Sequence, residues 1–190
     1  MAVGSARDFF WNELCDRYLE IVKPRMRSEE EAPRARQVLA FVLDQVLRLL
    51  HPFVPHVTEA LWERLGEVAP QRGIEEGLIT TSHVIEAPWP EVPDRWIDEG
   101  LEGRFETARA VVRSLRDVRK AYQVSSGTGL EVRVRAPVAS AAGLESLSGL
   151  VSHLARVETL SIGPGQERTS DSASVVVGDL EIFVVGVVDL

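Results

Sequence analysis

Two prolines, Pro52 and Pro55, constrain the fold of this chain more tightly than any other feature. They interrupt an apolar helical stretch that reads Leu49-Leu50-His51-Pro52-Phe53-Val54-Pro55-His56-Val57-Thr58-Glu59-Ala60-Leu61-Trp62. Pro52 has no N–H to donate and disfavours helical geometry in the residue before it. Pro55 fits the first turn of a new helix, where a missing N–H costs nothing. The stretch therefore predicts a tight corner between two helices that share one core.

Apolar residues recur with helical spacing through most of the first 124 residues. The pattern predicts four helices, at about 6–22, 33–50, 55–65 and 98–122. Pro24 and Gly66 are expected to end the first and third helices, and Ser28 with Glu31 fits a capping box before the second. Trp11 and Trp62 are expected in the core. These helices predict an antiparallel bundle over residues 1–124.

Residues 66–94 are punctuated by glycine and proline, which predicts an irregular loop region within that bundle. A short extended piece is expected at 78–80. Trp89 lies between two prolines, and we expect it to be anchored on the helices, because a tryptophan in a rigid segment commonly fills a gap.

The composition changes after the Ser125–Gly129 turn, where period-2 alternation replaces helical spacing. The pattern predicts a strand at 130–135, a helix at 141–157, a strand at 158–162 and a hairpin at 173–188 that turns at Gly178-Asp179. Residues 130–190 are therefore expected to form a small α+β domain. The predicted fold class is mainly α, with a helical bundle followed by this unit.

One side of the fourth predicted helix is basic. Its residues Arg109, Arg113, Arg116 and Lys120 are spaced by 4, 3 and 4, so they fall within roughly 60° of arc on an α-helix. The whole chain has a formal net charge of −8. From the residues alone, a surface that faces a polyanion and an ordinary solvated helix face explain this row equally well.

The sequence offers no catalytic or metal-binding pattern. The four histidines have no metal-ligand spacing, and neither a nucleophile motif nor a glycine-rich phosphate loop is present. A single cysteine, Cys15, allows no internal disulfide and fits a reducing, cytoplasmic location. No apolar run approaches the ~20 residues that cross a bilayer, so no membrane partner is expected. The residues favour a binding or interaction domain.

Three segments resemble the anticodon-binding domain of class I aminoacyl-tRNA synthetases for branched aliphatic amino acids. They are Asp8-Phe9-Phe10-Trp11-Asn12-Glu13-Leu14-Cys15-Asp16-Arg17-Tyr18-Leu19-Glu20 followed by Lys23-Pro24, the 49–62 corner with the later Trp89-Pro90, and Val112-Arg113-Ser114-Leu115-Arg116. The first segment is most similar to the valyl enzymes, although isoleucyl and leucyl enzymes share the corner. Two residues depart from the family, which usually has tryptophan at Arg17 and phenylalanine at His56.

The resemblance implies a tRNA-anticodon recognition module of a valine–tRNA ligase. The parent enzyme would use ATP with magnesium to attach valine to its tRNA, whereas this segment carries neither catalytic signature of the family and is expected to hold no cofactor. The chain looks like a fragment cut at both ends. The expected partners are valine-specific tRNA and the missing catalytic and C-terminal parts of the same chain.

The resemblance also directs attention to tRNA-binding residues on two helices. Asp16, Leu19 and Lys23 share one side of the first helix, where Leu19 could pack against a base and Lys23 could meet a phosphate. Core packing is the alternative for Leu19. Arg109, Arg113, Arg116 and Lys120 would position the RNA backbone. The competing function is a helical protein-interaction or interdomain module, in which the basic row meets an acidic protein surface.

Overall fold

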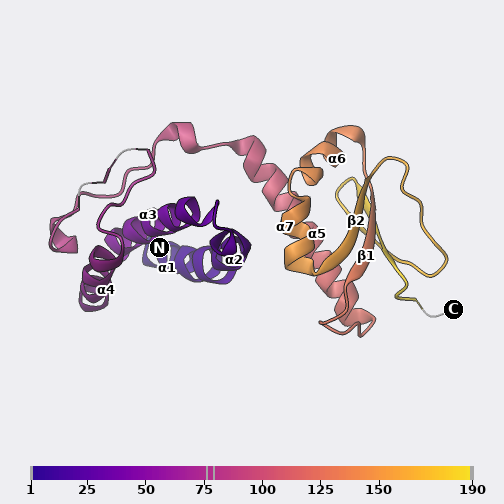
Figure 1. Ribbon diagram of the computed structural model, residues 1–190, viewed down its shortest axis with the longest axis horizontal. Coiled ribbons are helices and arrows are strands. Elements are labelled where there is room, and N and C mark those ends of the chain that lie inside the picture. Colours follow the sequence, from indigo (N-terminus) through magenta and orange to yellow (C-terminus); the bar gives the residue numbers. More distant parts are fainter. Residues whose placement is uncertain (1, 76, 79, 189–190) are drawn as a thin grey trace. The chain divides into compact units, whose positions relative to one another are not determined.

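The chain folds into two compact units, residues 1–93 and 94–190 (Figure 1). A computed structural model describes residues 2–75, 77–78 and 80–188. More than half of the chain is helical, and a four-stranded sheet lies in the second unit. The fold is therefore rich in α-helix, as the sequence predicts. Within the described residues, every helix is too short or too polar to span a lipid membrane.

The first unit begins with one uninterrupted helical rod made of α1 (Ala2–Asp8), a π-helix η1 (Phe9–Tyr18) and α2 (Leu19–Arg27). Pro24 lies inside α2, so the prediction that it ends the helix was wrong. Proline removes one backbone hydrogen bond, and this rod tolerates that loss. The π-helix also changes which side chains are buried, because its i→i+5 hydrogen bonds break the 3–4 spacing of an α-helix. Trp11 is 62% exposed, which contradicts its expected place in the core.

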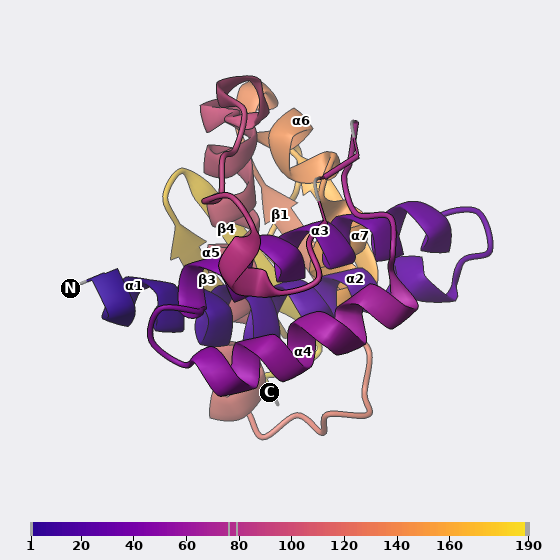
Figure 2. The same cartoon turned by 90° about the vertical axis from the view of Figure 1, so that its left-hand side faces the viewer.

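A four-residue turn reverses the chain into α3 (Ala32–Leu50), which packs along the rod in the opposite direction. Only half of the predicted capping box forms: the Glu31 N–H donates to Ser28 Oγ at 3.3 Å, while the Glu31 carboxylate pairs with Arg25. After the corner, α4 (Pro55–Val68) lies beside α3 (Figure 2). It runs past Gly66, whose interior position costs a helix only about 0.5–1 kcal/mol, so Gly66 is not the predicted stop.

Apart from the 3₁₀ turn η2 (Val84–Glu86), the described residues between 69 and 93 are irregular, as predicted for that part of 66–94. The extended piece expected at 78–80 includes Ile79, which lies outside the described residues. Trp89 is 64% exposed, so the prediction that it is anchored on the helices was wrong. Trp62, by contrast, is only 1% exposed and packs with Leu47 and Leu65, as predicted.

The second unit contains the short η3 (Asp94–Trp96), one long helix and a mixed sheet. In chain order, its main elements are α5 (Glu99–Ala121), β1 (Leu130–Arg135), α6 (Val138–Glu145), α7 (Ser148–Ala155), β2 (Val157–Gly163), β3 (Ala173–Val177) and β4 (Leu180–Val185). The strand order is β2-β1-β4-β3, with β1 parallel to β2 and antiparallel to β4. The predicted 173–188 hairpin is present, and Gly178 adopts a φ of +58° at its two-residue turn. The single helix predicted at 141–157 is instead two short helices.

The long helix α5 packs with the sheet. Its buried residues Ala108, Val111, Val112, Leu115 and Val118 share one core with apolar residues of β1, β4 and α7. Figure 1 shows α5, α6 and α7 on one side of the sheet. The sequence predicts domains at 1–124 and 130–190, which stays a prediction, and the compact units are residues 1–93 and 94–190. The difference arises because the apolar stripe of α5 is covered by strand residues that lie far from it in sequence.

Candidate nucleic-acid interface

The basic row of α5 lies beside the buried stripe of that helix. Arg113, Arg116 and Lys120 are exposed, and Arg109 is partly buried beside Glu106, with which it forms an ion pair. Among the described residues, Arg113, Arg116 and Lys120 form no ion pair with a carboxylate. The α-helical geometry of α5 keeps the four residues on one side, as the spacing predicts. The result is a strip of three unneutralised positive charges.

Two further arginines, which the sequence analysis missed, lie near this row where α7 ends. Arg116 donates to the Leu154 carbonyl at 2.9 Å, and Arg119 donates to the Ala155 carbonyl at 3.2 Å. Arg156 ends α7 in the left-handed conformation and donates to the Ser126 carbonyl. Burial, followed by the nearby charge of Arg156, lowers the pKa of Arg119 below its ordinary value. No sequence spacing indicates this cluster, because its members come from different elements.

The three candidate residues of the first rod lie in different surroundings. Asp16 is exposed on η1, Leu19 is half-buried at the start of α2, and Lys23 is exposed and pairs with Glu20. The partial burial of Leu19 leaves part of its side chain in contact with solvent.

The corner between α3 and α4 is fixed by a threonine that the sequence analysis did not single out. Thr58 is buried, its hydroxyl lies 3.0 Å from the Val54 and Pro55 carbonyls, and His51 Nδ1 lies 2.8 Å from the same oxygen. His51 therefore bridges the two helices. The role of His51 at the corner is structural. His56, in the first turn of α4, is exposed.

A buried charge network joins the corner helices to the loop that follows them. Asp44 is fully buried; its Oδ1 accepts from Arg48 Nε at 2.7 Å and its Oδ2 accepts from Arg72 Nη1 at 2.9 Å. The two guanidinium carbons lie 5.3 Å and 4.3 Å from the centre of the Trp62 ring, within the range of cation–π contacts. The i, i+4 pair of Asp44 and Arg48 inside an apolar helix stripe is the sequence signal that could have revealed it.

Three more hydrogen bonds hold the same loop against the helices. Trp62 Nε1 donates to the Thr81 carbonyl at 2.9 Å, Arg48 Nη1 donates to the Pro88 carbonyl at 3.1 Å, and Gln37 Nε2 donates to the Gly73 carbonyl at 2.7 Å. Irregular backbone must find partners for its buried polar groups, and these side chains supply them. The irregular loop thus has a defined path across α3 and α4.

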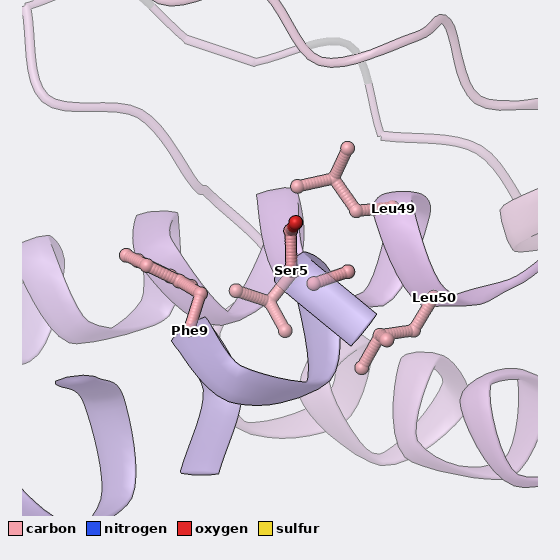
Figure 3. A pocket seen from close by; sticks show the side chains of 6 residues that line it. Ser5, Phe9, Leu49 and Leu50 are labelled. Carbon is pink, nitrogen blue, oxygen red and sulfur yellow. The ribbon is translucent and has the colours of Figure 1, made fainter. Parts of the chain in front are cut away.

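An apolar pocket of about 340 Å³ opens between the start of the rod and the end of α3 (Figure 3). Ser5, Ala6 and Phe9 line one side, and Val46, Leu49 and Leu50 line the other. The pocket offers almost no polar surface for recognition. It lacks the convergent polar groups that would orient a small ligand.

The described residues contain no group of three or more histidine, cysteine or carboxylate side chains that could hold a metal ion. The chain also contains no glycine-rich loop of the kind that cradles phosphates.

Comparison with known proteins assigns the chain to a family. The family model for the anticodon-binding domain of tRNA ligases matches residues 1–134, which include the rod, the corner, the loop and the whole of α5. The chain belongs to this family of anticodon-binding domains.

The relatives found by sequence similarity and described below are valine–tRNA ligases. The chain is 36% identical to a valine–tRNA ligase of Thermosynechococcus vestitus over 96% of its own length and 19% of that relative. It is 32% identical to the valine–tRNA ligase of Rhodopirellula baltica, covering 93% of this chain and 17% of that relative. The valine–tRNA ligase of Symbiobacterium thermophilum is 33% identical over the full chain and 22% of its own length. The resemblance to valyl enzymes is confirmed, and the chain spans about a fifth of the relatives it matches.

Proposed function

We propose that this chain is the tRNA-anticodon recognition module of a valine–tRNA ligase. The parent enzyme would attach valine to its tRNA with ATP and magnesium, in the cytoplasm, through parts of the protein outside this chain. This segment would bind and orient the tRNA without taking a chemical step. Valine-specific tRNA and the remaining parts of the parent chain are its proposed partners.

The observation that carries the proposal is the strip of unneutralised charge on α5, formed by Arg113, Arg116 and Lys120. A chain with a net charge of −8 repels polyanions over most of its surface, so a local strip without carboxylate partners favours one docking direction for RNA. Arginine and lysine contacts to phosphates position a nucleic acid without reading its sequence. Arg109, which is paired with Glu106, would extend the strip once RNA displaces that partner.

Base recognition is assigned to the first rod. Anticodon bases are unpaired and can be splayed out, so that apolar side chains pack on them while polar groups meet their edges. The exposed part of Leu19 would contact a base, Lys23 would meet the adjacent phosphate, and Asp16 lies on the same stretch of the rod. The antiparallel helical bundle that the sequence predicts over residues 1–124 is part of this proposal.

A salt titration tests this function directly. The chain's affinity for valine tRNA and for an unrelated tRNA is measured between 50 and 200 mM salt, for the wild type and for Arg113→Glu. Because each phosphate contact adds about 1 to the slope of log affinity against log salt, Arg113→Glu should lower that slope by about 1 or more. Preference for valine tRNA by the wild type would support anticodon recognition.

Arg168→Glu is the matched control, because it makes the same charge change at an exposed residue on the loop between β2 and β3. Its salt slope should stay near that of the wild type. If Arg113→Glu and Arg168→Glu lower the salt slope equally, RNA binding responds to the net charge of the chain and not to the strip. Salt-insensitive or undetectable RNA binding by the folded wild type would contradict the proposed function.

One observation favours a second candidate, an interdomain module. Several large apolar side chains of the first unit are exposed, namely Trp11, Phe53, Val57, Leu61 and Trp89. Exposed apolar groups of this size commonly mark protein contacts. If RNA binding is absent while the chain binds the separately produced catalytic part of the parent, and this binding survives 500 mM salt, the interdomain function is favoured.

A further inference from the structure

Three arginines gather where α7 ends, in the α+β part of the second unit. We call Arg116, Arg119 and Arg156 the α7-end cluster. Arg116 and Arg119 reach from α5 to the carbonyls of Leu154 and Ala155, and Arg119 also lies 3.3 Å from the Arg156 carbonyl. The Arg119 guanidinium also donates to the Ser125 and Thr128 carbonyls, at 2.7 and 2.8 Å. Backbone carbonyls thus hold the side chains of the cluster in place.

The cluster concentrates like charges without neutralising them. Among the described residues, none of its three members forms an ion pair with a carboxylate. The partial negative charge at the C-terminus of α7 offsets part of the repulsion, but α7 is only eight residues long and supplies no full charge. A bound anion would neutralise the remaining positive charge of the cluster.

Arg156 itself occupies a position that suits other residues better. Its φ is +54°, in the left-handed region where glycine and asparagine are favoured and most residues are disfavoured. Its side chain is exposed and makes one hydrogen bond, to the Ser126 carbonyl. An arginine here therefore contributes mainly a fixed, solvent-facing positive charge.

We propose that the α7-end cluster binds a phosphate of the RNA backbone, so that the small α+β unit itself contacts RNA. Arg116 belongs both to the α5 strip and to the cluster, which makes the two positive regions continuous. The exposed guanidiniums of Arg116 and Arg156 present planar, paired donors that match phosphate oxygens. Arg119, whose donors already hold backbone carbonyls, fixes the backbone at Arg156. This inference rests on the proposed function and extends it to residues beyond α5.

An RNA backbone fits this region better than an acidic protein surface does. The strip from Arg113 to Lys120 follows one helix over about 10 Å at 1.5 Å per residue, and the cluster continues it. A continuous line of cations suits the regular charge of a polynucleotide. It offers few apolar neighbours for a protein interface, since the exposed large apolar side chain of α5 is Leu101, in its first turn, and the exposed Tyr122 follows its last residue.

The decisive variant is Arg156→Asn, because asparagine accepts the left-handed conformation while removing the charge. Arg168→Asn is its matched control, and thermal unfolding of both variants checks the fold. RNA binding is measured with valine tRNA across the 50–200 mM salt series. We expect Arg156→Asn to lower the salt slope by about 1 and to weaken binding several-fold, with Arg168→Asn close to the wild type.

The outcomes separate this inference from the proposed function. If Arg113→Glu weakens binding while Arg156→Asn behaves like Arg168→Asn, the cluster is only a structural cap and the inference is wrong, although the proposed function stands. If the wild type shows no salt-dependent RNA binding, both are overturned. If Arg156→Asn weakens binding to an acidic protein but not to RNA, the surface belongs to a protein interface and the inference fails.

Discussion

At the residue scale, Asp44 is unusual because one buried carboxylate pairs with two buried arginines. Its carboxylate is fully buried and accepts hydrogen bonds from two arginines that are themselves buried, while Trp62 lies against both guanidiniums. A buried ion pair adds little net stability compared with apolar packing, yet removing one partner leaves an uncompensated charge. Loss of the Asp44 charge would therefore leave the buried guanidiniums of Arg48 and Arg72 without its compensation.

We expect Asp44→Asn to lower the free energy of unfolding of the first unit by about 3–5 kcal/mol, because two buried guanidiniums would lose the charged carboxylate that both of them contact. Urea unfolding followed by tryptophan fluorescence measures the change. Glu67→Gln is the comparison, since it breaks the exposed pair with Arg64 and should change stability by no more than about 1 kcal/mol. Equal effects in the two variants would show that the network is not energetically coupled.

A second prediction at this scale concerns pH. The hydrogen bond from His83 to Glu59, and then the charge of that carboxylate, raises the pKa of His83 above its ordinary value near 6.5. The stabilisation from this pair is thus fully present below the ordinary value and is lost as pH rises through the folded-state pKa. An NMR titration of the His83 ring should give a midpoint above 6.5 that falls toward 6.5 in Glu59→Gln. An unchanged midpoint in the variant would contradict the assigned cause.

At the scale of elements, α5 ends in a Schellman motif. The Val124 N–H donates to the Arg119 carbonyl at 2.9 Å, and the Gln123 N–H donates to the Lys120 carbonyl at 3.3 Å. Gln123 adopts a φ of +52°, where glycine is the usual residue. The helix therefore ends at a position that is strained for its side chain.

We expect Gln123→Gly to stabilise the second unit by about 0.5–1 kcal/mol, because relief of the left-handed strain exceeds the extra flexibility of glycine in the unfolded chain. Thermal unfolding measures the gain. Gln123→Ala serves as the control and should bring no gain, since alanine keeps the Cβ atom that causes the strain. A destabilised glycine variant would mean that the Gln123 side chain contributes contacts of its own.

Elements that depend on local signals were predicted well. The corner at Pro52 and Pro55, the strand at 130–135 and the hairpin that turns at Gly178 follow from proline geometry, alternation and turn chemistry. The predictions were wrong where the packing of the rod outweighed the local preference of a residue. The rod continues through Pro24, and its π-helical part moves Trp11 to the surface. The spacing of apolar residues does not distinguish a π-helix from an α-helix.

At the scale of the whole molecule, each compact unit has a core of its own. Leu47, Trp62, Leu65 and Val84 form the core of the first unit, and the core of the second unit lies between α5 and the sheet. Because α5 supplies much of the second core, the chain should divide at residue 94 and not at residue 130.

We expect a fragment of residues 94–190 to unfold cooperatively, and a fragment of residues 130–190 to remain unfolded because it lacks the apolar stripe of α5. Circular dichroism and thermal melting of the two fragments measure this difference. A cooperative transition in the shorter fragment would restore the division at 124–130 that the sequence predicts. An unfolded longer fragment would show that the second unit needs the first.

The sequence by itself determined the order of most helices and strands, the alignment of the basic row on one side of α5, and the resemblance to valyl enzymes that the comparisons confirm. These features depend on residues close together in the chain, where spacing and turn chemistry suffice. Only the tertiary structure decided that α5 shares a core with the sheet, that Asp44 binds Arg72, and that Arg119 donates to the Arg156 carbonyl. Such contacts bring together residues separated by tens of positions, and their choice depends on which apolar surfaces and charges the whole fold leaves to be covered.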